Sequence, residues 1–166
     1  MRSSRLRSFV VLFTVVVNLL LVDAVTKELA VAKLRGAAAV SLLPNLFNLA
    51  YVENRGCAWG LFQGQVWPLA VFGILAFGFL VWKRRSVFFD DAQLRVGGFR
   101  LAPAAEPLLY AGILGNVLDR LFRGFVVDML DFHWGVHHFP CFNLADTYIT
   151  VAAGLLILSS LGRRKP

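Results

Sequence analysis

The sequence predicts an all-α integral membrane protein with four transmembrane helices, both termini in the cytoplasm and a small β element on the outer face. Three observations lead to this fold class. The 166 residues are 58% hydrophobic and only 16% charged, whereas a soluble domain is about half apolar and about a quarter charged. Four long apolar stretches recur along the chain, and most of the basic residues lie on one side of them. The length suits a single membrane domain over residues 1–166.

Each apolar stretch approaches the roughly 20 residues that a helix needs to cross a bilayer. The four predicted spans cover about residues 8–25, 66–82, 101–118 and 144–161. The first begins like a signal peptide, but its apolar run is longer and no clear A-x-A cleavage motif follows it. We therefore interpret it as a retained helix, which leaves two outer segments, at about residues 26–65 and 119–142.

The basic residues set the orientation, because cytoplasmic loops of membrane proteins carry an excess of Lys and Arg. With four spans, the two termini and the segment between the second and third spans share one side. That side holds eleven of the 17 Lys and Arg residues, namely Arg2, Arg5, Arg7, Lys83, Arg84, Arg85, Arg95, Arg100, Arg163, Arg164 and Lys165. The net charge of +7 is therefore a topology signal. We expect no nucleic-acid partner, since no basic stripe with interleaved aromatic residues occurs.

The first outer segment contains a stretch typical of a β-strand. Residues 45–54, NLFNLAYVEN, are rich in apolar and aromatic residues and are bounded by a proline and an Asn-Arg-Gly turn signal. We expect a small β element on the membrane surface. Cys57 and Cys141 both fall on this outer side, where a disulfide is an open possibility. The absence of a C-x-x-C motif argues against a redox function.

Five aspartates gather where the predicted spans meet the outer surface. Asp23 closes the first span, Asp119 closes the third, and Asp146 lies in the first turn of the fourth. Asp128 and Asp131 lie in the segment between the last two spans. Acids at membrane depth are costly and usually face a cavity or a partner. Two carboxylates close together would share protons, so that one acts as a neutral acid while the other activates water as a base.

Some of these residues have simpler structural interpretations. Asn143 and Asp146 have the spacing of an N-cap and N3 pair, so the carboxylate could serve only to complement the start of a helix. Asp119 could form a structural ion pair with Arg120 or Arg123.

The segment between the third and fourth spans adds two acids and a histidine cluster. Asp131 is interpreted as an exposed loop acid, whereas Asp128 lies among apolar residues and is otherwise an outward-facing residue of a short strand. His133 and His137 have the spacing of a zinc-binding helix, but Trp134 stands where that motif has Glu, and nearby Gly and Pro favour a loop. We expect no metal here, and an aromatic loop at the level of the lipid headgroups.

Four short blocks occur in order, each at the outer side of the predicted topology. They are DAVTK at 23–27, NRGCAWG at 54–60, GILGNVLDR at 112–120 followed by GFVVD at 124–128, and FNLAD at 142–146. In these blocks the chain resembles lipoprotein signal peptidase, also called signal peptidase II. One such block is a weak signal, but four in order over most of the chain, from Asp23 to Ile149, are a strong one.

The resemblance implies an intramembrane aspartic endopeptidase that needs no metal or other cofactor. The family cleaves signal peptides from bacterial prolipoproteins, on the amino side of a cysteine that already carries diacylglycerol. Its two aspartates match Asp128 and Asp146. One carboxylate would take a proton from water while the other, protonated, hydrogen-bonds the scissile carbonyl, and either can hold the proton at rest. The implied partners are the diacylated prolipoprotein, membrane lipid and globomycin-type inhibitors. The implied location is the bacterial cytoplasmic (inner) membrane, with the active site near the periplasmic face.

The same resemblance gives the other motif residues supporting roles. Asn116 and Arg120 would face the cavity and bind substrate backbone carbonyls, and Asn143 would do likewise or cap the fourth span. Asn54 and Gly56 lie in the segment that would cover the site. The remaining positions are a polar scaffold of Asp23, Lys27 and Asp119, and the small Ala145, which would leave room for substrate.

The chain departs from the family pattern at three positions. Ala24 stands where Gln is usual, Ala111 where the first of two glycines is common, and Cys57 where Ala or another small residue is usual. These departures affect substrate fit and local packing, and none removes a catalytic group. The alternative from another class is a small four-span transporter or channel subunit, whose acids would be ion or proton sites. That alternative predicts acids near the midplane, whereas these lie at the ends of spans.

Overall fold

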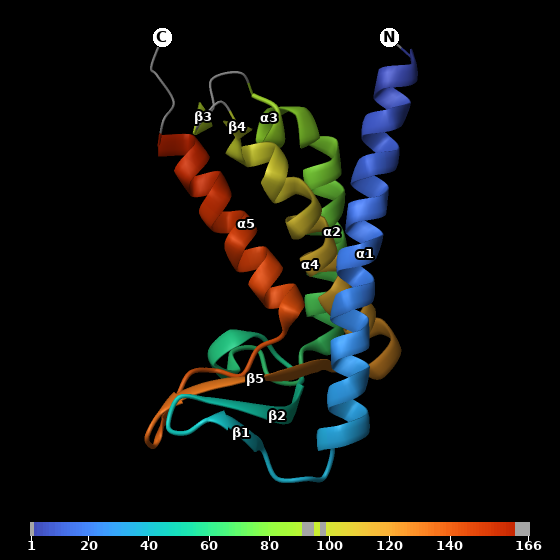
Figure 1. The fold of residues 1–166 in the computed structure, drawn as a ribbon. Coiled ribbons are helices and arrows are strands. Elements are labelled where there is room, and N and C mark those ends of the chain that lie inside the picture. Colours follow the sequence, from blue (N-terminus) through green and yellow to red (C-terminus); the bar gives the residue numbers. More distant parts are fainter. Residues whose placement is uncertain (1, 91–94, 97–98, 162–166) are drawn as a thin grey trace.

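Four long helices form a bundle with a small sheet at one end in the computed structural model, which describes residues 2–90, 95–96 and 99–161 (Figure 1). Side chains are described over residues 6–90 and 100–161. The helices are α1 (Arg2–Leu34), α2 (Val66–Trp82), α4 (Leu101–Arg123) and α5 (Leu144–Leu161). The centre of the bundle is α4, which packs against the other three.

Three of these helices are long and apolar enough to cross a membrane: α1 from Leu6 onward, α4 and α5. With its 17 residues, α2 is apolar but shorter, so a fourth span stays a prediction. The bounds of α2 and α5 match the predicted spans, whereas α1 continues to Leu34 and α4 to Arg123. The extra turns of α1 form because Ala30 and Leu34 are buried against the sheet.

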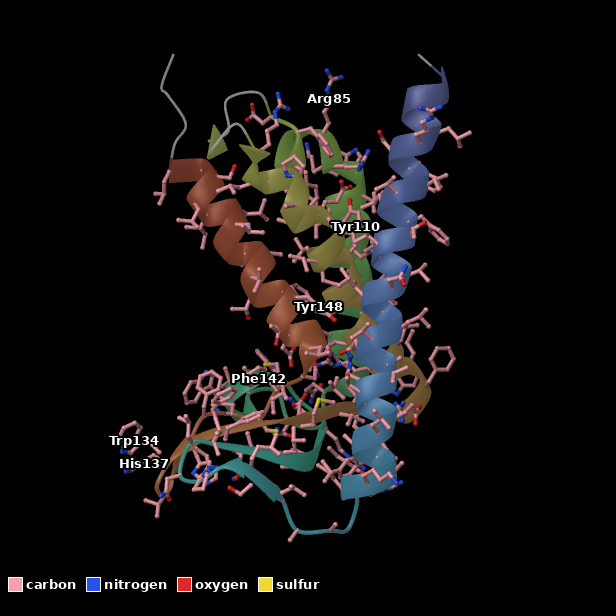
Figure 2. All side chains as sticks on the ribbon, in the orientation of Figure 1. Arg85, Tyr110, Trp134, His137, Phe142 and Tyr148 are labelled. Atoms are coloured by element: carbon pink, nitrogen blue, oxygen red, sulfur yellow. The ribbon has the colours of Figure 1, made fainter. Side chains whose placement is uncertain are left out.

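The bundle presents apolar side chains outward. Phe9 and Phe13 of α1 and Phe72 and Leu75 of α2 are each exposed over more than half of their surface. Exposed apolar surface of this extent favours a lipid environment. The N-terminal end of α1 and the C-terminal end of α5 lie at the same end of the bundle (Figure 1). Arg85 lies at that end too, opposite the sheet (Figure 2).

The sheet has the strand order β1-β2-β5-β6, and neighbouring strands are antiparallel. Its members are β1 (Val40–Leu43), β2 (Phe47–Asn54), β5 (Val126–Trp134) and β6 (His137–His138). The expected β element at 45–54 corresponds to β2. The segment 119–142, interpreted as a loop, instead contains the end of α4 and two strands. The sequence offered a short strand here only as the structural alternative for Asp128, because the aspartates interrupt the apolar pattern of VVDMLDFHW.

Smaller elements complete the fold. A short 3-10 helix, η1 (Ala58–Gly60), follows β2, while α3 (Arg84–Phe88), β3 (Arg95–Val96) and β4 (Phe99–Arg100) lie between α2 and α4. The buried Glu106 of α4 forms a two-point ion pair with Arg84 of α3. A buried carboxylate requires such a partner, so this pair ties α3 to α4.

Close packing of α4 against α5 depends on glycine. A Cβ atom at Gly112 would lie 2.5 Å from the Ala145 carbonyl oxygen and 2.7 Å from Ile149 Cγ1. Gly112→Ala should therefore force the helices apart and lower the free energy of unfolding of the detergent-solubilised protein by about 1–3 kcal/mol, with a lower melting temperature. The matched control is Gly154→Ala in α5, where a Cβ atom would meet nothing within 4 Å. Equal melting temperatures for the two variants would contradict this packing role.

Candidate active site

Backbone pairing brings the two distant aspartates together. Asp128 is the third residue of β5, opposite Val52 of β2. The carbonyl oxygen of Phe142 accepts hydrogen bonds from the amides of Met129 and Leu130, at 3.0 and 2.8 Å. Phe142 thus lies between the sheet and α5 (Figure 2). This pairing places the start of α5, and with it Asp146, beside the strand that carries Asp128.

Asn143 connects the two carboxylates. Its side-chain amide donates to Asp128 Oδ1 at 2.7 Å. Its backbone amide donates to Asp146 Oδ2 at 3.2 Å, and its Oδ1 accepts from the Asp146 amide at 3.0 Å. The second and third bonds form a reciprocal helix cap, as the N-cap and N3 spacing predicts. The cap therefore also fixes the position of the Asp146 carboxylate relative to Asp128.

Each carboxylate has one further amide donor. Asn54 at the end of β2 donates to Asp128 Oδ2 at 2.9 Å, and its own Oδ1 accepts from the Gly56 amide. Asn116 of α4 donates to Asp146 Oδ1 at 2.7 Å. Both aspartates are thus held on two sides by neutral donors.

Burial and charge change the acidity of Asp128. The residue is 1% exposed. Burial, and next the negative charge of Asp146, raise its pKa from 3.8 to about 7, against the opposing effect of the hydrogen bonds from Asn54 and Asn143. A carboxyl group in this environment retains a proton near neutral pH. Paired acids with one elevated pKa are the arrangement required for combined acid and base catalysis.

A buried ionic network supports the pair. Lys27 of α1 is 1% exposed and lies 2.8 Å from Asp23 Oδ2, 3.2 Å from Asp119 Oδ2 and 3.3 Å from Asn116 Oδ1. Asp23 Oδ1 accepts from the Ala145 amide, and Asp119 Oδ2 accepts from the amide of the residue before Asp128. These contacts form one polar network that joins α1, α4, α5 and β5. The ion pair expected for Asp119 forms with Arg123, at 2.9 Å.

A cavity of about 500 Å³ adjoins Asp146. Asp146 and Asn116 line it, as does Arg120, whose guanidinium donates to the carbonyl oxygens of Gly56 and Asn116 at 2.8 and 3.2 Å. Among the described residues, the buried Nε of Arg120 has no hydrogen-bond partner. A second, apolar cavity of about 960 Å³ between α2 and α4 shares Asn116, Arg120, Cys57 and Ile149 with the first. The two cavities therefore meet at Arg120.

Gly56, whose carbonyl oxygen accepts the hydrogen bond from Arg120, lies where there is no space for a side chain. A Cβ atom there would lie 2.5 Å from the Leu61 carbonyl oxygen. Cys57, next in the chain, donates from its thiol to that same oxygen, and both it and Cys141 line the first cavity as free thiols. The disulfide left open by the sequence is absent from this structure.

Ala145 is fully buried and would touch a Cβ atom placed at Gly115, so its small size allows α5 to pack closely on α4. One sequence interpretation requires correction. Asp131 is not an exposed loop acid: it lies in β5, is 9% exposed, and bonds to His138 Nδ1 at 2.8 Å and Asn48 Nδ2 at 3.1 Å. His138 and Asn48 hold the pKa of Asp131 below its usual range, although partial burial acts in the opposite direction.

The histidines lie on a β-hairpin and not on a helix. His133 is in β5 and His137 in β6, and the rings of His133 and His138 stack with centroids 4.8 Å apart. His137 and Trp134 lie at the outer tip of the hairpin (Figure 2). The helical geometry of the zinc alternative is therefore not formed.

Several cavity residues were not identified from the sequence. Thr150 of α5 lines the first cavity one turn after Asp146, and helical periodicity could have identified it. Phe139 also lines that cavity and packs edge-on against Trp59 of η1 at 5.6 Å between ring centroids. No sequence signal connects these two rings, because they belong to separate outer segments.

Comparison with known proteins decides the family. The family model described as Signal peptidase (SPase) II matches residues 15–162. The chain belongs to the signal peptidase II family. It is 40% identical to the lipoprotein signal peptidase of Shewanella loihica over 160 residues, covering 93% of this chain and 88% of that protein. It is 35% identical to the lipoprotein signal peptidase of Syntrophotalea carbinolica over 158 residues, covering 93% of each.

Solved structures agree with this assignment to signal peptidase II. Two structures titled as a bacterial membrane enzyme are each 30% identical to this chain, with TM-scores of 0.75 and 0.73. The alignments cover 93% of this chain and 94% of the first structure, and 91% and 87% for the second. The resemblance seen in the four sequence blocks is thus confirmed. Membership of the signal peptidase II family makes the chain a peptidase of a membrane family. This favours the peptidase interpretation over that of a transporter or channel subunit.

Proposed function

We propose that this chain is an aspartic endopeptidase that cleaves diacylglyceryl-modified prolipoproteins on the amino side of the lipidated cysteine. The observation that carries the proposal is the pair formed by Asp128 and Asp146, which Asn143 joins and of which Asp146 lines a cavity. Family membership supports prolipoprotein processing, and the paired carboxylates supply acid and base for peptide hydrolysis.

In the proposed reaction, Asp128 carries the resting proton because its pKa is raised, and Asp146 acts as the base. Asp146 removes a proton from water as the water oxygen attacks the scissile carbonyl carbon, while Asp128 gives its proton to the carbonyl oxygen. The resulting tetrahedral species collapses as the carbon–nitrogen bond breaks. Asp146 returns its proton to the leaving amine and the carbonyl proton returns to Asp128, so both groups regain their starting states.

The polar groups near the dyad would position the substrate. Arg120 already holds two backbone carbonyls of this chain, so its guanidinium is suited to bind carbonyls of an extended peptide. The apolar surface of the two connected cavities suits an apolar signal segment and acyl chains. The site would also accept globomycin-type inhibitors.

We further propose four spans with the active site at the outer, periplasmic side of the bacterial inner membrane. Arg85 and the outermost ends of α1 and α5 lie at the end of the bundle opposite the sheet, which supports a cytoplasmic location for that end (Figures 1 and 2). Part of the basic count lies outside the described residues, namely Arg163, Arg164 and Lys165. In α2, the 17 apolar residues would cross as the shortest span.

A cleavage assay with a diacylated lipobox peptide tests the function. We expect cleavage before the lipidated cysteine, inhibition by globomycin, and little turnover of the same peptide without lipid. A metal chelator should leave the rate unchanged. Absence of cleavage at that bond would overturn the proposed substrate, and a chelator-induced loss that zinc restores would overturn the metal-free mechanism.

The pH dependence tests the role of Asp128. Because its pKa is raised to about 7, the group is protonated below that value and ionised above it. We therefore expect kcat to fall as the pH rises through about 7, as the acid is lost. The measurement is kcat at saturating lipopeptide across this range, with Asp131→Asn as a variant that should keep the same profile. A rate that stays constant or increases on the alkaline side would contradict the assignment of the resting proton.

A further inference from the structure

A separate apolar cavity lies between the outer half of α1 and the sheet. Its volume is about 370 Å³, and it shares no lining residue with the two cavities at the candidate active site. Leu29 and Leu34 of α1, Leu49 of β2, Met129 of β5 and Leu144 of α5 supply most of its apolar wall. The proposed cleavage mechanism does not use this cavity.

Two lining residues are polar, and only one is available to a ligand. The Thr26 hydroxyl already donates within α1, to the carbonyl oxygens of Val22 at 3.0 Å and Asp23 at 2.8 Å. Lys33 is exposed, and its ammonium has no hydrogen bond or ion pair within the described part of the chain. By contrast, nearby Arg35 is paired with Glu53 at 3.4 Å.

Along α1 the lining residues are Thr26, Leu29, Ala30, Lys33 and Leu34, so the ammonium lies near one end of an apolar strip. Thr26 and Lys33 are separated by roughly 10 Å along the axis, given a rise of about 1.5 Å per residue. The end of α1 lies beside the sheet (Figure 1), and Lys33 is the second-last residue of that helix. Thr26 and Leu29, which also line the cavity, lie earlier along α1, toward the body of the bundle. In a membrane protein, a cationic group beyond an apolar surface lies at the depth of lipid phosphates.

We infer that this cavity binds one acyl chain of a membrane glycerophospholipid whose phosphate pairs with Lys33. The bound chain lies against Met129 and Leu144, which directly follow Asp128 and Asn143 in the sequence. The lipid therefore supports the strand and helix start that hold the dyad, from the side away from the catalytic cavity. The inference rests on the membrane setting of the family and not on the proposed cleavage reaction.

Native mass spectrometry of the full chain in detergent tests the inference. The probes are dioleoylphosphatidylglycerol and dioleoylglycerol, which share acyl chains but differ in the phosphate. Lys33→Gln removes the cation, and Leu29→Glu places a charge on the apolar wall at a residue that is 54% exposed, so the fold is retained. The matched control is Arg35→Gln, which makes the same charge change two residues away.

We expect one tightly retained phosphatidylglycerol, weaker retention of dioleoylglycerol, and a loss of phosphatidylglycerol affinity of about fivefold in Lys33→Gln. Leu29→Glu should abolish retention, while Arg35→Gln should bind as the unmodified chain does. Equal losses in Lys33→Gln and Arg35→Gln would overturn the phosphate contact. Equal retention of the two probes, or a dimer that disappears in Leu29→Glu, would overturn the choice of occupant.

Discussion

Asp128→Asn and Asp146→Asn should each lower the rate of lipopeptide cleavage by at least about a thousandfold while leaving the fold intact. Either change removes a group that must gain and lose a proton in each turnover, and losses of this order are typical when a catalytic acid or base is removed. The side chain stays the same size, and the amide can keep contacts with Asn143 in both cases. The measurement is single-turnover cleavage of the diacylated peptide, with far-UV circular dichroism and melting temperature as tests of the fold.

The matched control for both variants is Asp131→Asn. Asp131 lies in the same strand as Asp128 and is also buried, but it bonds to His138 and Asn48 on the hairpin side of the sheet. Its loss should change cleavage by less than about tenfold, because it does not contact the dyad. Near-normal turnover by either dyad variant would contradict the aspartic mechanism. An equal loss in Asp131→Asn would indicate damage to the sheet instead of lost chemistry.

Lys27→Met should give the largest loss of stability among single substitutions in the polar scaffold. The change removes the cation between Asp23 and Asp119, both of which are less than 10% exposed. An uncompensated buried charge costs about 3–5 kcal/mol. The same substitution removes the contact to Asn116, which holds Asp146, so cleavage should fall as well. Thermal unfolding in detergent measures the first effect and the lipopeptide assay the second.

Lys83→Met is the control for this substitution. Lys83 is exposed at the opposite end of the bundle, where its ammonium lies over the Trp82 ring. Loss of that contact should cost less than about 1 kcal/mol. A melting temperature for Lys27→Met equal to that of Lys83→Met would show that the buried network contributes little to stability.

Apolar run length was sufficient to predict the four long helices. The bounds of α2 and α5 follow directly from the two apolar stretches, and capping chemistry was visible in the spacing of Asn143 and Asp146. The far end of α1 was missed because residues after Val25 are mixed in polarity and are helical only through packing against the sheet. Hydropathy alone therefore identified which stretches are helical better than where each one ends.

Sequence by itself determined the membrane class, the signal peptidase II family and the two candidate catalytic aspartates, since each depends on composition or on short blocks. Only the tertiary structure decided what surrounds those aspartates. Backbone hydrogen bonds join Phe142 to β5. The Lys27 side chain bonds to Asn116 of α4, and the Asn54 side chain of β2 bonds to Asp128. Tertiary structure also separates the roles of Asp128 and Asp131. Both are aspartates of β5, but only Asp128 lies where the start of α5 meets the sheet. Contacts between residues distant in sequence depend on the packing of whole elements, which no local pattern encodes.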